Sequence, residues 1–337
     1  MLVRSFDDVI ARVRGLSSRL LGRPELERLA LSRDTDALVD GFKGTSYDSI
    51  AALTTREPIP LEREARRVAG GRLGIISAWC ADRDEVLVPL FEDEDRRNLR
   101  ALTRAVLAQT PPEQRTAGLL PTPGLPAPAL EEIAHLTRLR DVAALLTSWG
   151  NPYGRAISVE ALRPHPDLFL LQLAIDRTFA ARALDAATRF GEPILSYVRL
   201  LIDAENGTSV MALASGAIEH DHEVLFIPGG SLIAFEDYRD LSTMKPHDAR
   251  ARLSRIVAGT QLAPIASAAA GTNPDNAVLT AHLRELHRTS RLNPLSLTVL
   301  LEYILRLRAE THDVARVIWG IAMQMPRRRI INSFVTP

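Results

Sequence analysis

The densest group of ionisable side chains lies in the run Phe91-Glu-Asp-Glu-Asp-Arg-Arg97. Carboxylates on successive helical turns, followed by arginines, are typical of the magnesium and diphosphate site of helical isoprenoid synthases, because carboxylate oxygens bind Mg²⁺ well. Such an enzyme needs a second acidic cluster facing the first, and Asp203-Ala-Glu205 lacks the spacing for it. We favour the alternative, in which the acids occupy a helix start, where the helix dipole stabilises negative charge.

A second candidate site is the run Glu219-His-Asp-His-Glu223, which places two imidazoles and three carboxylates in five residues. Both groups are ordinary zinc ligands. Histidines two positions apart, without a distant third ligand, are nevertheless more typical of a solvated loop. Residues 109–115, about 107 positions earlier, form a connector rich in proline and polar side chains. We therefore predict a loop here and no metal site.

The glycine-rich run Pro228-Gly-Gly-Ser231 resembles a phosphate loop but lacks the Gly-Lys-Ser/Thr that follows in such loops. We interpret it as a turn at Gly229 and Gly230, followed by Ser231 capping a helix. The sequence has no histidine pair of the zinc-protease kind and no Gly-x-Ser-x-Gly elbow. We expect no catalytic residue, no cofactor and no bound metal, and hence a protein that is not an enzyme.

Composition excludes further classes of function. The 337 residues carry 41 basic and 41 acidic side chains, so no net basic field attracts nucleic acid. The single cysteine, Cys80, excludes an intramolecular disulfide and multi-cysteine metal sites, which fits a reducing, cytosolic compartment. The N-terminus lacks a signal-peptide pattern. The most apolar tract, residues 295–305, is shorter than the ~20 apolar residues of a membrane span. We therefore expect no membrane-spanning segment.

Apolar residues recur at steps of three and four along most of the chain, which predicts amphipathic helices. Clear stripes run over residues 6–20, 133–146 and 314–325. The only strand-like run, Val224 to Ile227, is short and ends in prolines and glycines. Aromatic residues make up only 5% of the chain, so the core must consist mainly of Leu, Ala, Ile and Val. We predict an all-α fold.

An internal period of about 107 residues organises these helices. Three turns beginning with glycine are offset by 106 and 109 residues: Gly44 to Tyr47, Gly150 to Tyr153 and Gly259 to Leu262. Three polar runs keep the same spacing: Asp95 to Asn98, Asp203 to Asn206 and Glu310 to Asp313. A third element, Leu119 to Leu125, has its partner in Phe226 to Leu232. The period predicts three similar helical units, residues 1–118, 119–226 and 227–337.

The glycine turns have a structural interpretation. Gly44, Gly150 and Gly259 are expected to terminate helices in the left-handed conformation, which glycine adopts without steric cost. Tyr47 and Tyr153 stand in the turns that follow. We expect these residues to shape the chain and not to bind a ligand.

Several motifs, in this order and spacing, resemble the C/d-type family of rotary V-type and A-type ATPase subunits, which includes the corresponding C-type component of bacterial V/A-type ATP synthases. The resemblance runs from about residue 5 to 330. Local departures occur at Gln261-Leu262 in the third turn, at Gly207-Thr208 after Asn206, and at 122–124. The motifs that carry it are Ala11 to Leu16, Arg19 to Leu21, Gly44 to Tyr47, Asn98 to Arg100, Asn151 to Gly154, Leu173 to Arg177, Ile227 to Gly230, Pro294 to Ser296, and Ala309 to Arg316.

The resemblance implies a non-catalytic adaptor of three helical subdomains around a pseudo-threefold axis, shaped like a funnel. Its wide mouth would receive the tip of the central-stalk shaft subunits, and its opposite face would rest on the membrane proteolipid rotor ring. It would be a peripheral protein on the cytoplasmic face of the membrane, passing torque during ATP-linked proton or other ion transport. An unrelated helical scaffold protein is the first alternative, and an Mg²⁺-dependent synthase-like enzyme is the second.

Three arginines near the end of the chain, Arg327, Arg328 and Arg329, have two interpretations. They could contact phospholipid headgroups or an acidic patch on a partner, as basic clusters beside membranes do. They could instead be a solvated segment after a helix, whose C-terminal dipole favours cations. Both interpretations stay open from the sequence.

Overall fold

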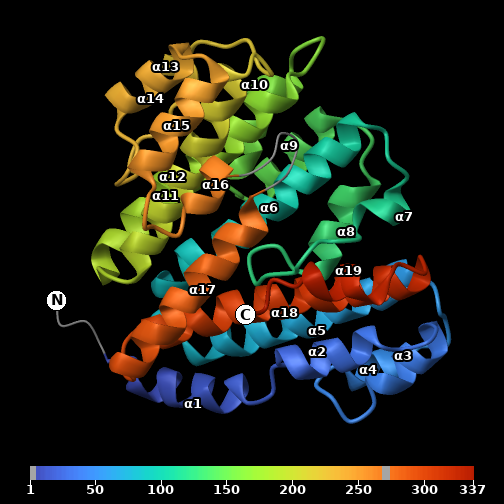
Figure 1. Ribbon diagram of the computed structural model, residues 1–337. Coiled ribbons are helices and arrows are strands. Elements are labelled where there is room, and N and C mark those ends of the chain that lie inside the picture. Colours follow the sequence, from blue (N-terminus) through green and yellow to red (C-terminus); the bar gives the residue numbers. More distant parts are fainter. Residues whose placement is uncertain (1–4, 268–273) are drawn as a thin grey trace.

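The structure, a computed structural model, describes residues 5–267 and 274–337 (Figure 1). Within these ranges the regular structure is helical, with no strand, so the all-α prediction is confirmed. The strand-like run from Val224 falls in and after the short helix α13. The helices are α1 (Asp7–Ser17), α2 (Arg23–Ala30), α3 (Thr35–Gly41), α4 (Asp48–Ala51), α5 (Pro58–Trp79), the 3-10 helix η1 (Asp84–Leu87), α6 (Val88–Leu107), α7 (Pro112–Arg115), α8 (Ala127–His135), α9 (Leu139–Ser148), α10 (Tyr153–Ala161), α11 (Leu168–Phe190), α12 (Ile194–Ala214), α13 (His222–Leu225), α14 (Phe235–Thr243), α15 (Pro246–Ile256), α16 (Ala263–Ser267), α17 (Asp275–Leu292), α18 (Thr298–Ala322) and α19 (Arg327–Asn332).

The longest helices form the body of the molecule. Helix α6 packs along α11, which packs along α12, and α18 packs along both α5 and α17. In Figure 1, α5 and α18 lie side by side although they come from opposite ends of the chain. The first and last long helices are therefore neighbours, which a linear stack of repeats would not allow.

Groups of short helices pack against the long helices. Helices α8 and α9 contact α6, and α14 and α15 contact α12. Helices α2 and α3 contact α18, from the other end of the chain. Their apolar side chains form a second core cluster with the C-terminal part of α18 and with α19, including Leu26, Phe42, Val317 and Ile330. The N-terminal short helices are thus fixed by the C-terminal part of the protein.

The three glycine turns adopt the predicted conformation. The φ angles of Gly44, Gly150 and Gly259 are 72°, 70° and 73°, in the left-handed region that favours glycine. They follow the ends of α3, α9 and α15. Tyr47 and Tyr153, in the turns after the first two, are at most 1% exposed. The first two turns thus bury a large side chain directly after the chain reverses, and the purely structural role of these residues stays a prediction.

The turn at 228–231 differs from the prediction in one respect. Ser231 does not cap a helix, since α14 begins only at Phe235, with Ala234 as its N-cap residue. The backbone amide of Ser231 instead donates to the Asp203 carboxylate at 2.8 Å. Gly230 lies so close to this carboxylate that a Cβ atom would stand 2.2 Å from Oδ1. The turn is therefore built around Asp203 of α12.

The predicted unit boundaries fall between helices. Residue 118 lies between α7 and α8, and residue 226 directly follows α13. The division into three superposable units stays a prediction. Across residues 5–267 and 274–337, no helix combines the length and apolarity that crossing a membrane requires.

Candidate functional site

Buried charge is concentrated where α6, α11, α12 and α18 meet. Ionised groups taken out of water are tolerated only when they are paired and hydrogen-bonded. Here each charged group has opposite charges within ion-pair distance. This cluster, called the central network below, consists of Arg96, Arg97, Arg100, Arg308, Asp93, Glu94, Asp176 and Glu205.

Arg96 of α6 is the most enclosed arginine of this network, with a side chain only 2% exposed. Its Nη2 donates to Oδ1 of Asp93 at 2.8 Å, one turn earlier in the same helix. Its Nη1 donates to Oδ1 of Asp176 on α11 at 3.0 Å and to Oε1 of Glu205 on α12 at 2.8 Å. The guanidinium lies over the Phe179 ring, 4.9 Å from its centroid. One side chain thus ties three helices together.

Arg308 brings α18 into the same network. Its Nη2 donates to Oδ2 of Asp93 at 2.6 Å, and its Nε donates to Glu94. The Tyr197 hydroxyl of α12 donates to the same Asp93 oxygen at 2.8 Å. Asp93, which is fully buried, therefore accepts hydrogen bonds from three helices. Its position depends on all of them.

The surrounding charges set the ionisation of the acids. Burial alone would raise the pKa of Asp93, but Arg97, Arg308 and Arg96 together hold it well below its usual value. Burial likewise opposes ionisation of Glu205, but Arg100 and Arg96 lower its pKa. Burial and the charge of Glu205 raise the pKa of the neighbouring Asp176. The network is thus built from fixed ion pairs around Asp93 and Glu205.

The acids of the run 92–95 do not form a magnesium site. Glu92 accepts from Arg182 of α11 at 2.6 Å, Glu94 from Arg308, and Asp95 from the Thr122 hydroxyl. The expectation that they occupy a helix start is wrong: α6 begins at Val88, and the acids lie in its second turn. Three of these acids are buried, and each accepts a hydrogen bond from a side chain on another element.

Asp203, expected in the synthase-like interpretation to face Asp93, holds backbone amides of the turn at 231–233 instead. Asp93 lies in the central network, so the two carboxylates do not share a cavity. In the described part of the chain, no group of three or more His, Cys, Asp and Glu side chains is placed to hold a metal ion. The geometry therefore does not favour the synthase-like interpretation.

The run from Glu219 to Glu223 packs onto other elements. Nε2 of His220 lies 3.1 Å from the Asp167 carboxylate, and its ring stacks on Phe169 at 5.9 Å. His222 is the first residue of α13 and lies near the Phe235 ring. The two imidazoles thus serve different contacts.

Arg327, Arg328 and Arg329 are exposed and form the first turn of α19. Helix α18 ends at Ala322, and residues 323–326 separate it from this turn, so the arginines do not lie at its C-terminus. Their charge therefore lies at the end of a helix where the dipole does not favour cations. A helix-dipole role does not explain them.

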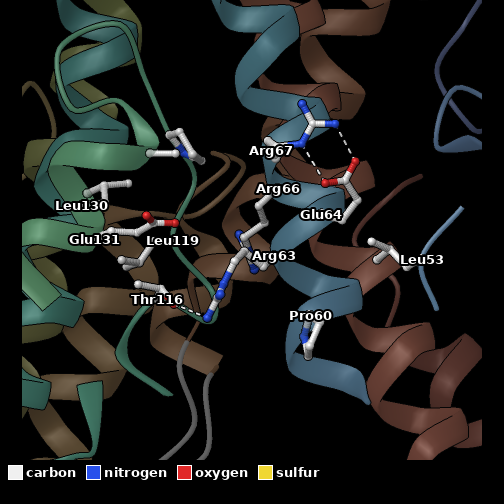
Figure 2. A pocket seen from close by; sticks show the side chains of 12 residues that line it. Leu53, Pro60, Arg63, Glu64, Arg66, Arg67, Thr116, Leu119, Leu130 and Glu131 are labelled. Atoms are coloured by element: carbon white, nitrogen blue, oxygen red, sulfur yellow. Dashed lines mark hydrogen bonds and ion pairs between the residues drawn. The ribbon is translucent and has the colours of Figure 1, made fainter. Parts of the chain in front are cut away.

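An apolar groove of about 270 Å³ runs between α5 and residues 116–131 (Figure 2). Three of its charged side chains are engaged: Arg67 pairs with Glu64 at 2.6 Å, and Arg63 donates to the Thr116 hydroxyl at 2.9 Å. Among the lining residues there is no nucleophile beside a base. The groove offers apolar area, not a reaction centre. Apolar side chains line both of its sides: Leu53, Pro60, Leu119 and Leu130.

Sequence reasoning missed most of the central network. In the sequence analysis, Arg100 and Asp176 appeared only as parts of motifs, and no role was given to Arg308, Tyr197 or Glu205. One signal was available, because Asp176 lies one helical turn from Leu173 and Phe179, and Arg308 lies one turn from Ile304 and Leu305. A lone charge on the apolar face of a helix must be paired if the face is buried.

We predict that Arg96→Met lowers the free energy of unfolding by roughly 3–5 kcal/mol, because it leaves Asp176 and Glu205 short of a buried donor. Arg189→Met is the matched control, since the ion pair of Arg189 with Glu85 is more than half exposed on both sides, 55% and 61%. Such a pair contributes only about 0–1 kcal/mol. Urea denaturation, monitored by circular dichroism, measures the free energy of unfolding of both variants. Equal losses would contradict a structural role for the network.

We also predict a pH dependence from Asp95, whose pKa is raised to about 7 chiefly by burial. The folded state retains this proton where the unfolded state has lost it, so stability falls as pH rises from about 4 through 7. Asp95→Asn removes this loss. Between pH 5 and 8 the variant should gain on the order of 2 kcal/mol relative to wild type. Urea denaturation at both pH values measures this gain, and an equal stability difference at the two pH values would contradict the prediction.

The comparison with known protein families gives a match. A family model described as the ATP synthase (C/AC39) subunit matches residues 9–333. No curated protein matches the chain closely enough to count as a relative. The family match spans nearly the whole chain. The chain therefore belongs to the ATP synthase (C/AC39) subunit family, a non-catalytic subunit of V/A-type rotary ATPases.

Proposed function

We propose that this chain is the rotor adaptor of its rotary ATPase, coupling the central-stalk shaft to the membrane proteolipid ring during ATP-linked ion translocation. Its place would be at the cytoplasmic face of the membrane, as a peripheral part of the complex. The observation that carries this proposal is the central network, which ties α6, α12 and α18 together at their crossing. Directional ion pairs between these helices support a stiff body that can pass torque.

We further propose that residues 1–118, 119–226 and 227–337 are three similar units around a pseudo-threefold axis, and that they enclose a funnel-shaped cavity for the shaft tip. Support comes from the left-handed glycines 44, 150 and 259, each of which precedes a short helix and then a long one. The contact of α5 with α18 also supports a closed arrangement. An open helical scaffold would leave these two helices apart.

Binding of the shaft should be substantially polar and should weaken with added salt. The chain has many arginines, and exposed charge pairs are screened over about 8–10 Å at ordinary ionic strength. Titration calorimetry with the organism's own shaft subunits, at low and at high salt, measures this. The absence of a complex at low salt would contradict the adaptor function. A complex indifferent to salt would contradict only the electrostatic part.

Arg327, Arg328 and Arg329 are proposed to contact the rotor ring or the headgroups around it, because they are exposed and clustered on one turn. A variant with all three changed to Gln should lose co-sedimentation with vesicles carrying the purified ring. It should keep its affinity for the shaft. The matched control changes the exposed Arg104, Arg138 and Arg140 to Gln. Equal loss in both variants would point to net charge and contradict a local contact.

A further inference from the structure

Two linkers of the chain are held by the same kind of side chain in the same way. Asn98 of α6 accepts a hydrogen bond from the amide of Leu120 at 3.0 Å and donates to its carbonyl at 2.7 Å. Asn206 of α12 accepts from the amide of Ile227 at 2.9 Å and donates to its carbonyl at 2.8 Å. Each asparagine side chain thus pairs with both backbone groups of one linker residue.

An acid three residues before each asparagine holds the end of the same linker. Asp95 accepts from the Thr122 hydroxyl, whose oxygen in turn accepts from the amide of Leu125 at 2.9 Å. Asp203 accepts directly from the amide of Ile233 at 3.0 Å. Leu125 and Ile233 stand directly before the N-cap residues of α8 and α14. Each long helix therefore fixes the start of the next group of short helices.

Helix α18 has the same two polar positions, but they hold two segments that are far apart in the sequence, at Leu21 and at Val335. Asp313 accepts from the amides of Val335 at 2.9 Å and Thr336 at 2.8 Å. The separation from Asp313 to Val335 is 22 residues, against 22 and 21 in the two linkers. Glu310, three residues earlier, accepts from the amide of Leu21 at 2.6 Å. Leu21 stands directly before the N-cap residue of α2.

The start of α2 and the C-terminal segment also contact each other. Nη1 of Arg23, the first residue of α2, donates to the carbonyl of Thr336 at 3.2 Å. Its guanidinium lies 6.0 Å from the centroid of the Phe334 ring. The C-terminal segment and the start of α2 thus meet where a continuous linker would run.

We propose that residues 334–336 and Leu21 together form a third linker in two pieces, which Glu310 and Asp313 hold as a terminal clasp. The clasp joins the short helices α2–α4 to α18 and closes the body without a covalent connection. This inference concerns the fold and does not depend on the proposed function. It implies that the joint between α18 and α2–α4 depends on these hydrogen bonds and can open locally while the chain stays intact.

The test compares three matched substitutions by hydrogen exchange and mass spectrometry on the full chain. Asp313→Leu should raise amide exchange in α2–α4 at least ~10-fold, about 1.4 kcal/mol of local opening. Asn98→Leu should do so in α8 and α9, and Asn206→Leu in α14 and α15. Asp313→Asn should stay closer to wild type than Asp313→Leu, because asparagine holds the other two linkers.

A rise confined to α19 and the C-terminal segment after Asp313→Leu would overturn the proposal, as would a uniform rise over the whole chain. Should this variant not fold, a circular permutant decides. Pro337 is joined to Ser5 by a flexible glycine-serine linker, and the new ends are placed between Pro123 and Gly124. The permutant should fold with wild-type helix content, because it connects the two held segments through α1 and moves the chain ends to another linker. Failure of the permutant to fold would contradict the proposal.

Discussion

A guanidinium group removed from water must be surrounded by acceptors, and the long helices are arranged around one such group, that of Arg96. Its acceptors come from α6, α11 and α12. Each acceptor carries a charge that needs further donors, which Arg100 and Arg308 supply. Removing one member leaves a buried charge without its partner, at a cost of several kcal/mol. The positions of four helices are therefore coupled through one cluster of side chains.

The same requirement for partners governs the segments between the helices. Buried amides outside a helix have no intrahelical acceptor and must find one elsewhere. Asn206 and Asp203 provide acceptors for residues 227–233, and Glu310 provides one for Leu21. Polar residues at fixed positions of the long helices thus determine where the short helices begin. The recurrence of these positions accounts for the period seen in the sequence.

The sequence predicted the all-α fold and the left-handed glycines well, because helical periodicity and the steric freedom of glycine are local properties. It did not predict the hydrogen-bond and ion-pair partners of the polar and charged residues. Ser231 was expected to cap a helix, but its partner is Asp203, 28 residues earlier in the chain. The acids at 92–95 were assigned to a helix start. Their partners lie on α11, α18 and the 119–125 linker, which are distant in the sequence and could not be identified from the local pattern. Periodicity identifies the apolar face of a helix, but it does not say which charges a neighbouring helix will bury.

A non-catalytic subunit has no chemical need for buried charge, so the central network calls for a mechanical explanation. Apolar contacts are non-directional and stabilise burial in any geometry that excludes water. Replacing buried ion pairs by well-packed apolar side chains often preserves stability or increases it. What the pairs add is direction: Asp93 accepts from Arg96, Arg308 and Tyr197 only while α6, α12 and α18 keep one relative position. Sliding of these helices under load would break several short hydrogen bonds at once. The network therefore suits the adaptor role proposed above, in which the body keeps its shape while it passes torque.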